Sequence, residues 1–387
     1  MRLVSIDNLE PGALLARDVW TGASGSIPLL RAGVYLTPDY LERLQRTGIA
    51  AIYVNDELSD GIEVPELLRE ETRRKAAKAI QHAFLELPRS AAAGRGLPQA
   101  VLNDLKSVVE RILADLQAAG DAAIAFKDMS TADAYTTQHS VQVTVLGLLV
   151  GRRVFHDYGW VDYRRQRSFA KTSEALSRLG LGLLLHDIGK LTVPSGVLNK
   201  PGKLDENEWQ LVKGHPAAGE AMLRSDLISA LAKGVVRSHH ERYDGSGYPD
   251  GLVGDDIPQF ARIAAVADVY DAMTSARPYR GAAPASVGVD EIIEGKGTHY
   301  EPQIVAAFRK VVAPYPVGSC VTLTDGRRGI VSDLPTDDLD RPTVRLYAEP
   351  DGSPSPPTEI TLDSYPDLAI SGLDGNPPRA VAYPRAA

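Results

Sequence analysis

The sequence predicts a mainly α-helical protein with a small α+β unit at the N-terminus and a small β-rich unit near the C-terminus. Between residues 65 and 313, long stretches repeat apolar side chains with the helical spacing i, i+3, i+4. Residues 1–64 combine short apolar runs with one helix signal, and residues 314–373 show apolar alternation interrupted by turn residues. With 387 residues, the chain is long enough for about two or three domains.

The composition is that of an ordinary globular protein, with 44% hydrophobic residues and a formal net charge of −8. This charge disfavours binding to DNA, RNA or an anionic membrane. Cys320 is the only cysteine, which excludes an intrachain disulfide and favours a reducing compartment. No apolar run approaches the roughly 18 residues of a membrane span, and the N-terminal stretch lacks the apolar core of a signal peptide. We therefore expect a cytoplasmic protein without a nucleic-acid or membrane partner.

Residues 1–64 predict a small α+β domain. The run LLARDVW and residues 27–30 are typical of short strands, and IAAIYV is typical of a closing strand. Between them, Thr37 and Pro38 predict a helix start with proline at the first helical position, and Gly48 predicts its C-terminal cap. This unit carries no ligand spacing, so a packing role is favoured over a sensory one.

Residues 65–127 predict a helical linker of two helices, separated by a break at residues 87–98. The second helix carries an apolar stripe, which we expect to pack on the following bundle or to form a dimer. The stripe consists of Val101, Leu105, Val108, Val109, Ile112 and Leu116.

Residues 128–313 predict a helical catalytic domain whose loops are marked by Gly and Pro, with an apolar helix that begins at His139. A polar and basic segment at 152–178 interrupts the hydrophobic pattern. After residue 314, alternation around an Asp325-Gly326 turn predicts a small β unit. We expect residues 374–387 to be disordered.

Side chains that favour metals concentrate between residues 181 and 280, each at or near an end of a segment that is typical of an apolar helix. A buried imidazole or carboxylate without a partner costs roughly several kcal/mol, so this concentration predicts a shared metal site. The residues are His186, Asp187, His215, His239, His240 and Asp268.

Helix ends allow these side chains to converge. Adjacent helical residues point about 100° apart, so His186 and Asp187 approach one metal only at a helix end, where Asp187 is free to bridge two ions. Gly189 is the predicted cap of that helix. Histidine and carboxylate without thiolate suit Fe, Mn, Zn or Ni, and two bridged ions suit in-line attack on a phosphodiester.

A phosphodiester substrate also needs groups that hold its phosphates and bases. Lys190, Arg277 and Arg280 are the basic candidates near the predicted site. Asp271 lies one helical turn after Asp268 and is expected to bond a base or to orient a ligand.

Four motifs occur in order: HDIGK at 186–190, GHP at 214–216, HHERYDGSGYP at 239–249 and VADVYDAMTSARPYR at 266–280. This series resembles that of the HD-GYP family, a branch of the HD superfamily of metal-dependent phosphohydrolases. The resemblance covers about residues 130–313. It implies a helical HD-type bundle that hydrolyses cyclic di-GMP to pGpG and often to GMP, through a metal-bridging hydroxide.

The resemblance also implies roles for individual residues. Asp187 and Lys190 match catalytic positions, and Tyr135 stands where some members carry a third-metal glutamate, which favours two divalent ions, iron or manganese. The implied metal ligands are His139, His186, Asp187, His215, His239, His240 and Asp268. The implied substrate contacts are Lys190, Asp271, Arg277, Arg280 and Tyr248, which lies in the name-giving GYP loop.

Two alternatives remain beside cyclic di-GMP hydrolysis. The first is hydrolysis of another nucleotide, such as mixed cyclic GMP-AMP or a guanosine polyphosphate. The second is a weakly active receptor or scaffold with a signalling-protein partner at the GYP loop or the N-terminal unit. The complete ligand set favours an enzyme, and a homodimer stays open.

Overall fold

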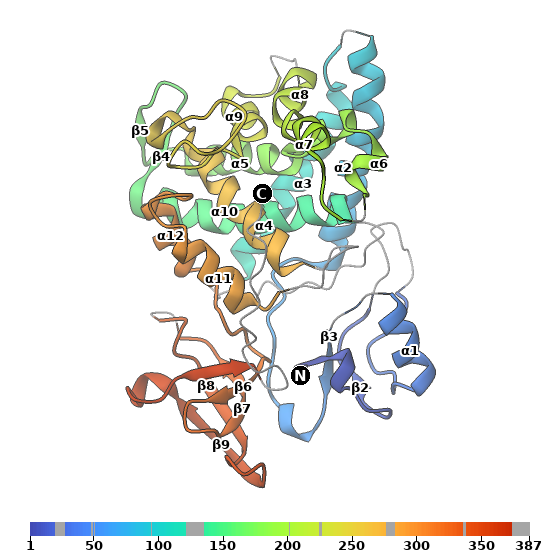
Figure 1. Cartoon of the computed structure of the whole chain (residues 1–387), viewed down its shortest axis with the longest axis vertical. Coiled ribbons are helices and arrows are strands. Elements are labelled where there is room, and N and C mark those ends of the chain that lie inside the picture. The colour runs from blue at the N-terminus through green and yellow to red at the C-terminus, as the bar shows by residue number, and fades with distance from the viewer. Residues whose placement is uncertain are drawn as a thin grey trace.

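The chain is described by a computed structural model that covers residues 1–19, 28–47, 49, 51–93, 95–120, 135–200, 202–223, 227–275, 283–335 and 338–373. Most of the helices form one bundle in the upper half of Figure 1, and two small sheet-containing units, one of which carries a helix of its own, lie side by side below it. The predicted mainly α fold class is confirmed. The predicted disorder of 374–387 lies outside the described residues.

The N-terminal unit is a three-stranded antiparallel sheet of order β1-β3-β2, covered by α1 (Pro38–Arg46). The Thr37 hydroxyl accepts a hydrogen bond from the Tyr40 amide at 3.3 Å, which caps the helix as the sequence predicted. β3 (Ala51–Asn55) is the expected closing strand, whereas the expected LLARDVW strand shortens to β2 (Leu14–Leu15). β1 (Arg2–Ser5) was not predicted, and Gly48 lies outside the described residues.

Two helices, α2 (Glu70–Ala92) and α3 (Gln99–Ala118), lead into the bundle. All six residues of the predicted stripe on α3 are buried in the bundle core, so this stripe packs on the bundle. The break expected at residue 87 was placed too early, because α2 continues through Pro88 to Ala92. Leu87 is fully buried in the core, and this packing holds the helix across the proline.

The bundle is built on α4 (Tyr135–Tyr158), α5 (Thr172–Leu185), α9 (Ala230–Ser238) and α10 (Gln259–Thr274), which pack against one another. α4 begins four residues before His139, so the prediction that this histidine starts the helix was wrong. Further helical elements of this part of the chain are η4 (Ile188–Thr192), α6 (Ser195–Leu198), α7 (Glu206–Lys213), α8 (His215–Met222), η5 (Gly254–Asp256), α11 (Ala285–Glu294) and α12 (Pro302–Arg309).

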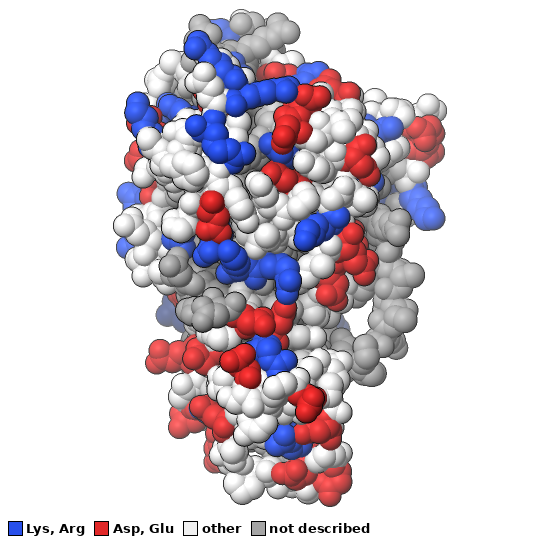
Figure 2. Space-filling model, turned by 90° about the vertical axis from the view of Figure 1, so that its left-hand side faces the viewer, with Lys and Arg blue, Asp and Glu red and all other residues white. Residues whose placement is uncertain are grey.

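The basic segment 152–178 completes α4, turns through a short hairpin and begins α5. The hairpin pairs β4 (Trp160–Val161) with β5 (Arg167–Ser168). Its turn carries several exposed basic side chains. Figure 2, which faces the side on which β4 and β5 lie in Figure 1, shows Lys and Arg gathered over the upper, helical part and mostly acidic side chains over the lower part. The net negative charge is therefore unevenly distributed over this face.

Asp157 ties the end of α4 to the end of α12. Its carboxylate accepts hydrogen bonds from Arg153 at 2.8 Å and Lys310 at 3.1 Å, and it lies 2.9 Å from the His156 ring. Burial alone would raise the pKa of Asp157, but these three partners hold it well below its ordinary value. The His156 side chain is 80% exposed, as expected for a surface residue.

The C-terminal unit is a five-stranded antiparallel sheet of order β10-β6-β7-β8-β9. Gly326, with a φ of 89°, makes the predicted turn between β6 and β7. The strands are β6 (Cys320–Leu323), β7 (Arg328–Asp333), β8 (Thr343–Ala348), β9 (Pro354–Thr361) and β10 (Ile370–Leu373).

The two small units share a hydrophobic core, which the sequence did not predict. Tyr53 and Val64 from the N-terminal unit pack with Val317 and Ile330 from the C-terminal unit. The Leu3 amide also donates to the Gly318 carbonyl at 2.8 Å. Within the described part of the chain, every helix is too short or too polar to cross a bilayer.

Candidate metal centre

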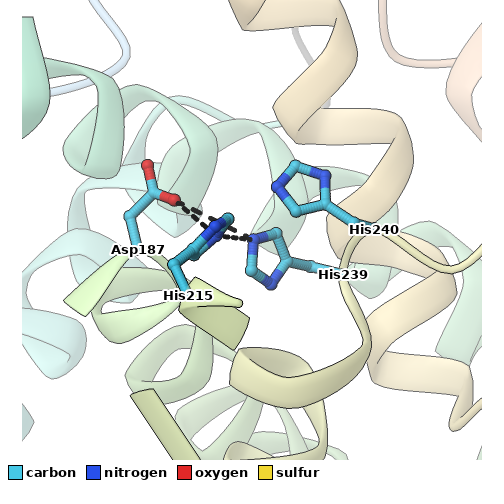
Figure 3. Close-up of side chains that lie close together, drawn as sticks. All are labelled: Asp187, His215, His239 and His240. Atoms are coloured by element: carbon cyan, nitrogen blue, oxygen red, sulfur yellow. Dashed lines mark hydrogen bonds and ion pairs between the residues drawn. The ribbon is translucent and has the colours of Figure 1, made fainter. Parts of the chain in front are cut away.

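Two groups of metal-type side chains meet at the centre of the bundle. Asp187, His215, His239 and His240 form one group (Figure 3). His139, His186 and Asp268 form the other, and within each group the ligand atoms lie within 4.8 Å of one another. The structure therefore brings together all seven residues that the sequence proposed as ligands.

The side chains reach the centre from helix ends and from the interior of a helix. His186 and His239 are the C-terminal caps of α5 and α9, as the sequence predicted. His215 is the first residue of α8, and Asp268 lies inside the almost entirely buried α10. Each residue is thus carried to the centre by its own helix, and residues that lie far apart in the sequence meet in one place.

Asp187 joins the two groups. Its Oδ1 lies 3.3 Å from Nε2 of His215 and 3.9 Å from Nε2 of His239. Its Oδ2 lies 3.4 Å from Nε2 of His186 and 3.6 Å from Nε2 of His139. One carboxylate therefore presents one oxygen to each group.

Backbone carbonyls orient three of the imidazoles. Nδ1 of His186 lies 2.8 Å from the Leu183 carbonyl, Nδ1 of His215 lies 2.7 Å from that of Val212, and Nδ1 of His239 lies 3.0 Å from that of Val236. Because a carbonyl only accepts, each Nδ1 carries the proton and each Nε2 presents its lone pair to the centre. These carbonyls can accept from the imidazoles because they lie in the last turn of a helix, where carbonyls lack the usual i+4 amide partner.

These inward lone pairs fit a cation. Nε2 of His215 and Nε2 of His239 lie 3.3 Å apart. Burial and the neighbouring histidines hold the pKa of His239 well below its ordinary value, which disfavours a shared proton. Nε2 of His186 and Oδ1 of Asp187 are buried and have no hydrogen-bond partner within the described ranges. Such groups are costly unless ligated, so the donor set fits divalent metal ions.

His139 is held from behind by Asp271. Nδ1 of His139 donates to Oδ2 of Asp271 at 2.6 Å, and its Nε2 lies 3.0 Å from Oδ1 of Asp268. Burial lowers the pKa of His139, but these two carboxylates raise it to about 9. Asp271 is 1% exposed, and its Oδ1 also accepts from the Ser275 hydroxyl. Both oxygens of Asp271 are bonded inside the protein, and one orients His139, which fits the second of the two roles expected for Asp271.

His240 faces the GYP loop. Its ring stacks on Tyr248 with a centroid distance of 4.8 Å and an interplanar angle of 26°. Burial is the main cause that lowers the pKa of His240, to about 3. Burial likewise raises the pKa of the Tyr248 phenol, so the ring beside the metal ligands stays neutral.

Gly189 has a different role from the predicted helix cap. It lies within η4, and a Cβ built on it would lie 1.8 Å from the His215 carbonyl oxygen and 2.6 Å from the Gly219 amide nitrogen. The segment after Asp187 thus packs backbone against backbone on the start of α8. This contact fixes the position of the candidate ligand His215 relative to Asp187.

Glu241 fastens the GYP loop and was missed by sequence reasoning. Its carboxylate is 2% exposed and accepts hydrogen bonds from the backbone amides of Asp250 at 2.7 Å and Leu252 at 3.1 Å. The Asp250 side chain also pairs with Arg237 of α9 at 2.7 and 2.8 Å. The available signal was an acid directly after two ligand histidines.

Of the three basic residues predicted to contact phosphate, the structure describes only Lys190. Nζ of Lys190 donates to Oδ2 of Asp187 at 2.6 Å, and its side chain is 28% exposed, so the ammonium lies between the buried carboxylate and the surface. Arg277 and Arg280 lie outside the described residues.

Comparison with known proteins identifies the family to which the chain belongs. A family model described as HD domain matches residues 160–304. A cyclic di-GMP phosphodiesterase of Pseudomonas aeruginosa is 34% identical over 334 residues, which cover 79% of this chain and 75% of that protein. A response regulator of Xanthomonas campestris pv. campestris, named as a cyclic di-GMP phosphodiesterase, is 47% identical over 126 residues (32% of this chain, 33% of that protein). A 3'3'-cGAMP-specific phosphodiesterase of Vibrio cholerae is 42% identical over 123 residues (31% of this chain, 24% of that protein). The chain therefore belongs to the HD-GYP family of HD-domain phosphodiesterases.

Proposed function

We propose that this enzyme hydrolyses cyclic di-GMP to pGpG, GMP or both in a metal-dependent reaction. The observation that carries the proposal is the pair of buried ligand groups joined through the two oxygens of Asp187. The names of the Pseudomonas and Xanthomonas relatives support the choice of substrate.

The proposed metal ligands are His139, His186, Asp187, His215, His239, His240 and Asp268. Two divalent ions held there, iron or manganese, would lower the pKa of a coordinated water and neutralise charge on the phosphate. Because these side chains are oriented by backbone carbonyls and by Asp271, little rearrangement is needed when ions bind.

The chain supplies the remaining groups. Lys190 is the catalytic cation, placed to donate from Nζ to a phosphoryl oxygen as negative charge develops on it. Tyr248 positions substrate beside His240, and its neutral ring adds no repulsion toward an anionic phosphodiester. Arg277 and Arg280 complete the proposed phosphate contacts.

The test is to purify the protein without oxygen, measure its iron and manganese by elemental analysis, and identify the products formed from cyclic di-GMP. We expect bound metal and release of pGpG or GMP. Asp187→Ala should lose both metal and turnover, whereas Asp256→Ala, at an exposed surface ion pair, should retain both. Full recovery of cyclic di-GMP by metal-loaded wild-type protein would contradict the proposal.

A mixed cyclic GMP-AMP dinucleotide is the second candidate substrate, favoured by the similarity to the Vibrio cholerae 3'3'-cGAMP-specific enzyme. Competition between the two cyclic dinucleotides decides, because specificity is a ratio of kcat/KM values. Binding of cyclic di-GMP without turnover in metal-loaded protein would instead support a receptor.

We further propose that residues 128–313 are the catalytic domain, reached through the helical linker 65–127. The N-terminal domain 1–64 and the β unit 314–373 then form its base. Their shared core of Tyr53, Val64, Val317 and Ile330 supports a structural role for both.

A further inference from the structure

A line of aromatic rings leads outward from the metal centre. The ring of His240 stacks on Tyr248, and Tyr248 makes a T-shaped contact with Trp209 of α7 at a centroid distance of 6.0 Å and an interplanar angle of 78°. Trp209 is partly exposed, and Nζ of Lys213 lies 5.8 Å from its ring centroid. A large π surface and a cation thus lie two ring contacts from a proposed metal ligand.

α7 holds this tryptophan firmly. Asp205 and Glu208 form a capping box at the start of the helix, with bonds of 2.9 and 2.8 Å. Lys200 also pairs with both oxygens of Glu208, at 2.8 and 2.6 Å. At the other end of α7, the Val212 carbonyl accepts from His215. Trp209 is therefore fixed with respect to the metal centre through one short, capped helix.

Loop packing alone does not explain the residue type. An aliphatic side chain on α7 would also cover the edge of Tyr248, without leaving an indole partly exposed beneath a lysine. Indole and phenol rings are the side chains that stack on nucleobases, and such stacking tolerates any base because every base has a π face. A nearby cation also attracts the phosphates of an anionic ligand.

We propose that Trp209 and Tyr248 form a purine-stacking subsite for a cyclic dinucleotide whose phosphate lies at the metal centre. This inference rests on the proposed function and extends it to a residue outside the family motifs. Because stacking does not read base edges, Trp209 favours substrates that carry bases over base-free phosphodiesters and does not distinguish guanine from adenine.

The experiment compares Trp209→Ala and Trp209→Phe with wild type on cyclic di-GMP, 3'3'-cGAMP and bis(p-nitrophenyl) phosphate, a phosphodiester without bases. We expect Trp209→Ala to lower kcat/KM for the two dinucleotides, relative to the base-free substrate, by about tenfold, mainly through KM. Trp209→Phe should restore most of this ratio. Leu211→Ala, at a 51% exposed position of the same helix, is the matched control and should leave the ratio unchanged.

Three results would overturn the subsite. The first is that Trp209→Ala leaves unchanged the kcat/KM for the dinucleotides relative to that for the base-free substrate. An equal loss on all three substrates is another, because it would show that Trp209 acts only by supporting His215. A loss confined to one dinucleotide would overturn the lack of base discrimination.

Calorimetric titration with both dinucleotides separates this inference from the proposed function. If wild type turns over neither dinucleotide but binds one, weaker binding by Trp209→Ala supports the subsite while the hydrolytic proposal fails. If wild type neither binds nor hydrolyses them, both proposals fail.

Discussion

Replacing Gly189 by alanine tests whether the backbone contact between η4 and α8 sets the metal site. An added Cβ would lie 1.8 Å from the His215 carbonyl oxygen, whereas real Cβ contacts are essentially never shorter than 3.0 Å. The two backbones must therefore separate by about 1.2 Å, the difference between these distances. The three nearest atoms that it would meet all belong to the backbone, so no side-chain rotation relieves the contact.

This displacement is large for a metal site. A metal–nitrogen bond is about 2.0–2.1 Å long, so moving His215 by more than an ångström relative to Asp187 breaks the shared geometry. Altering only the support of a ligand costs about 10–100-fold in metal affinity. We therefore expect Gly189→Ala to lower metal affinity at least about tenfold and to destabilise the fold by about 2 kcal/mol from overpacking.

The assay is metal content after dialysis against graded chelator, together with urea unfolding of the same samples. Gly196→Ala is the matched control, because a Cβ there meets nothing within 4 Å and the residue lies in the neighbouring helix α6. If Gly189→Ala retains metal and stability like Gly196→Ala, the close contact does not position His215 and the reasoning is refuted.

Three further changes test the surroundings of the site. Glu241→Gln should lower the free energy of unfolding in urea by about 2–3 kcal/mol, because the amide nitrogen of glutamine cannot accept a hydrogen bond and one backbone N–H group loses its partner. The control Asp256→Asn, at an exposed ion pair, should lower it by less than about 1 kcal/mol. Equal effects of the two substitutions would contradict the role of Glu241. Asp271→Asn should weaken metal retention about 10–100-fold by removing the charge behind His139, and unchanged retention would refute it. Asp157→Asn should destabilise the protein by about 1 kcal/mol at pH 7. The folded-state pKa of Asp157 is depressed far below its unfolded value, so this difference should begin to shrink as pH falls below about 4 and should continue to shrink toward the folded-state pKa; a difference that stays constant between about pH 4 and pH 2 would contradict it.

The ligand set was predictable because its signals are local. A histidine pair that ends an apolar segment, a histidine before Pro216 and a lone carboxylate in the apolar helix around Asp268 are all visible in short stretches of sequence. Helix periodicity likewise revealed the stripe on α3, and the apolar run IAAIYV revealed the closing strand β3. Metal chemistry then required these side chains to converge, and the structure brings them together.

The features that were missed are contacts that the periodicity of apolar residues does not report. Asp271 was expected to bond a base or to orient a ligand, but its spacing from Asp268 did not show that its partner is His139 of α4. Gly189 looks like a helix cap until α8 is packed against it. Glu241 bonds backbone amides of its own loop, and backbone partners leave no mark in the side-chain pattern.

The joint between the two small units has a consequence for how the molecule comes apart. The residues of their common core come partly from before the bundle in the sequence and partly from after it. The bundle is therefore inserted, in sequence, between the two halves of one structural unit. Deleting residues 314–373 would uncover Tyr53 and Val64 at the opposite end of the sequence. Neither small unit is a detachable module, and trimming one is expected to make the other aggregate or unfold.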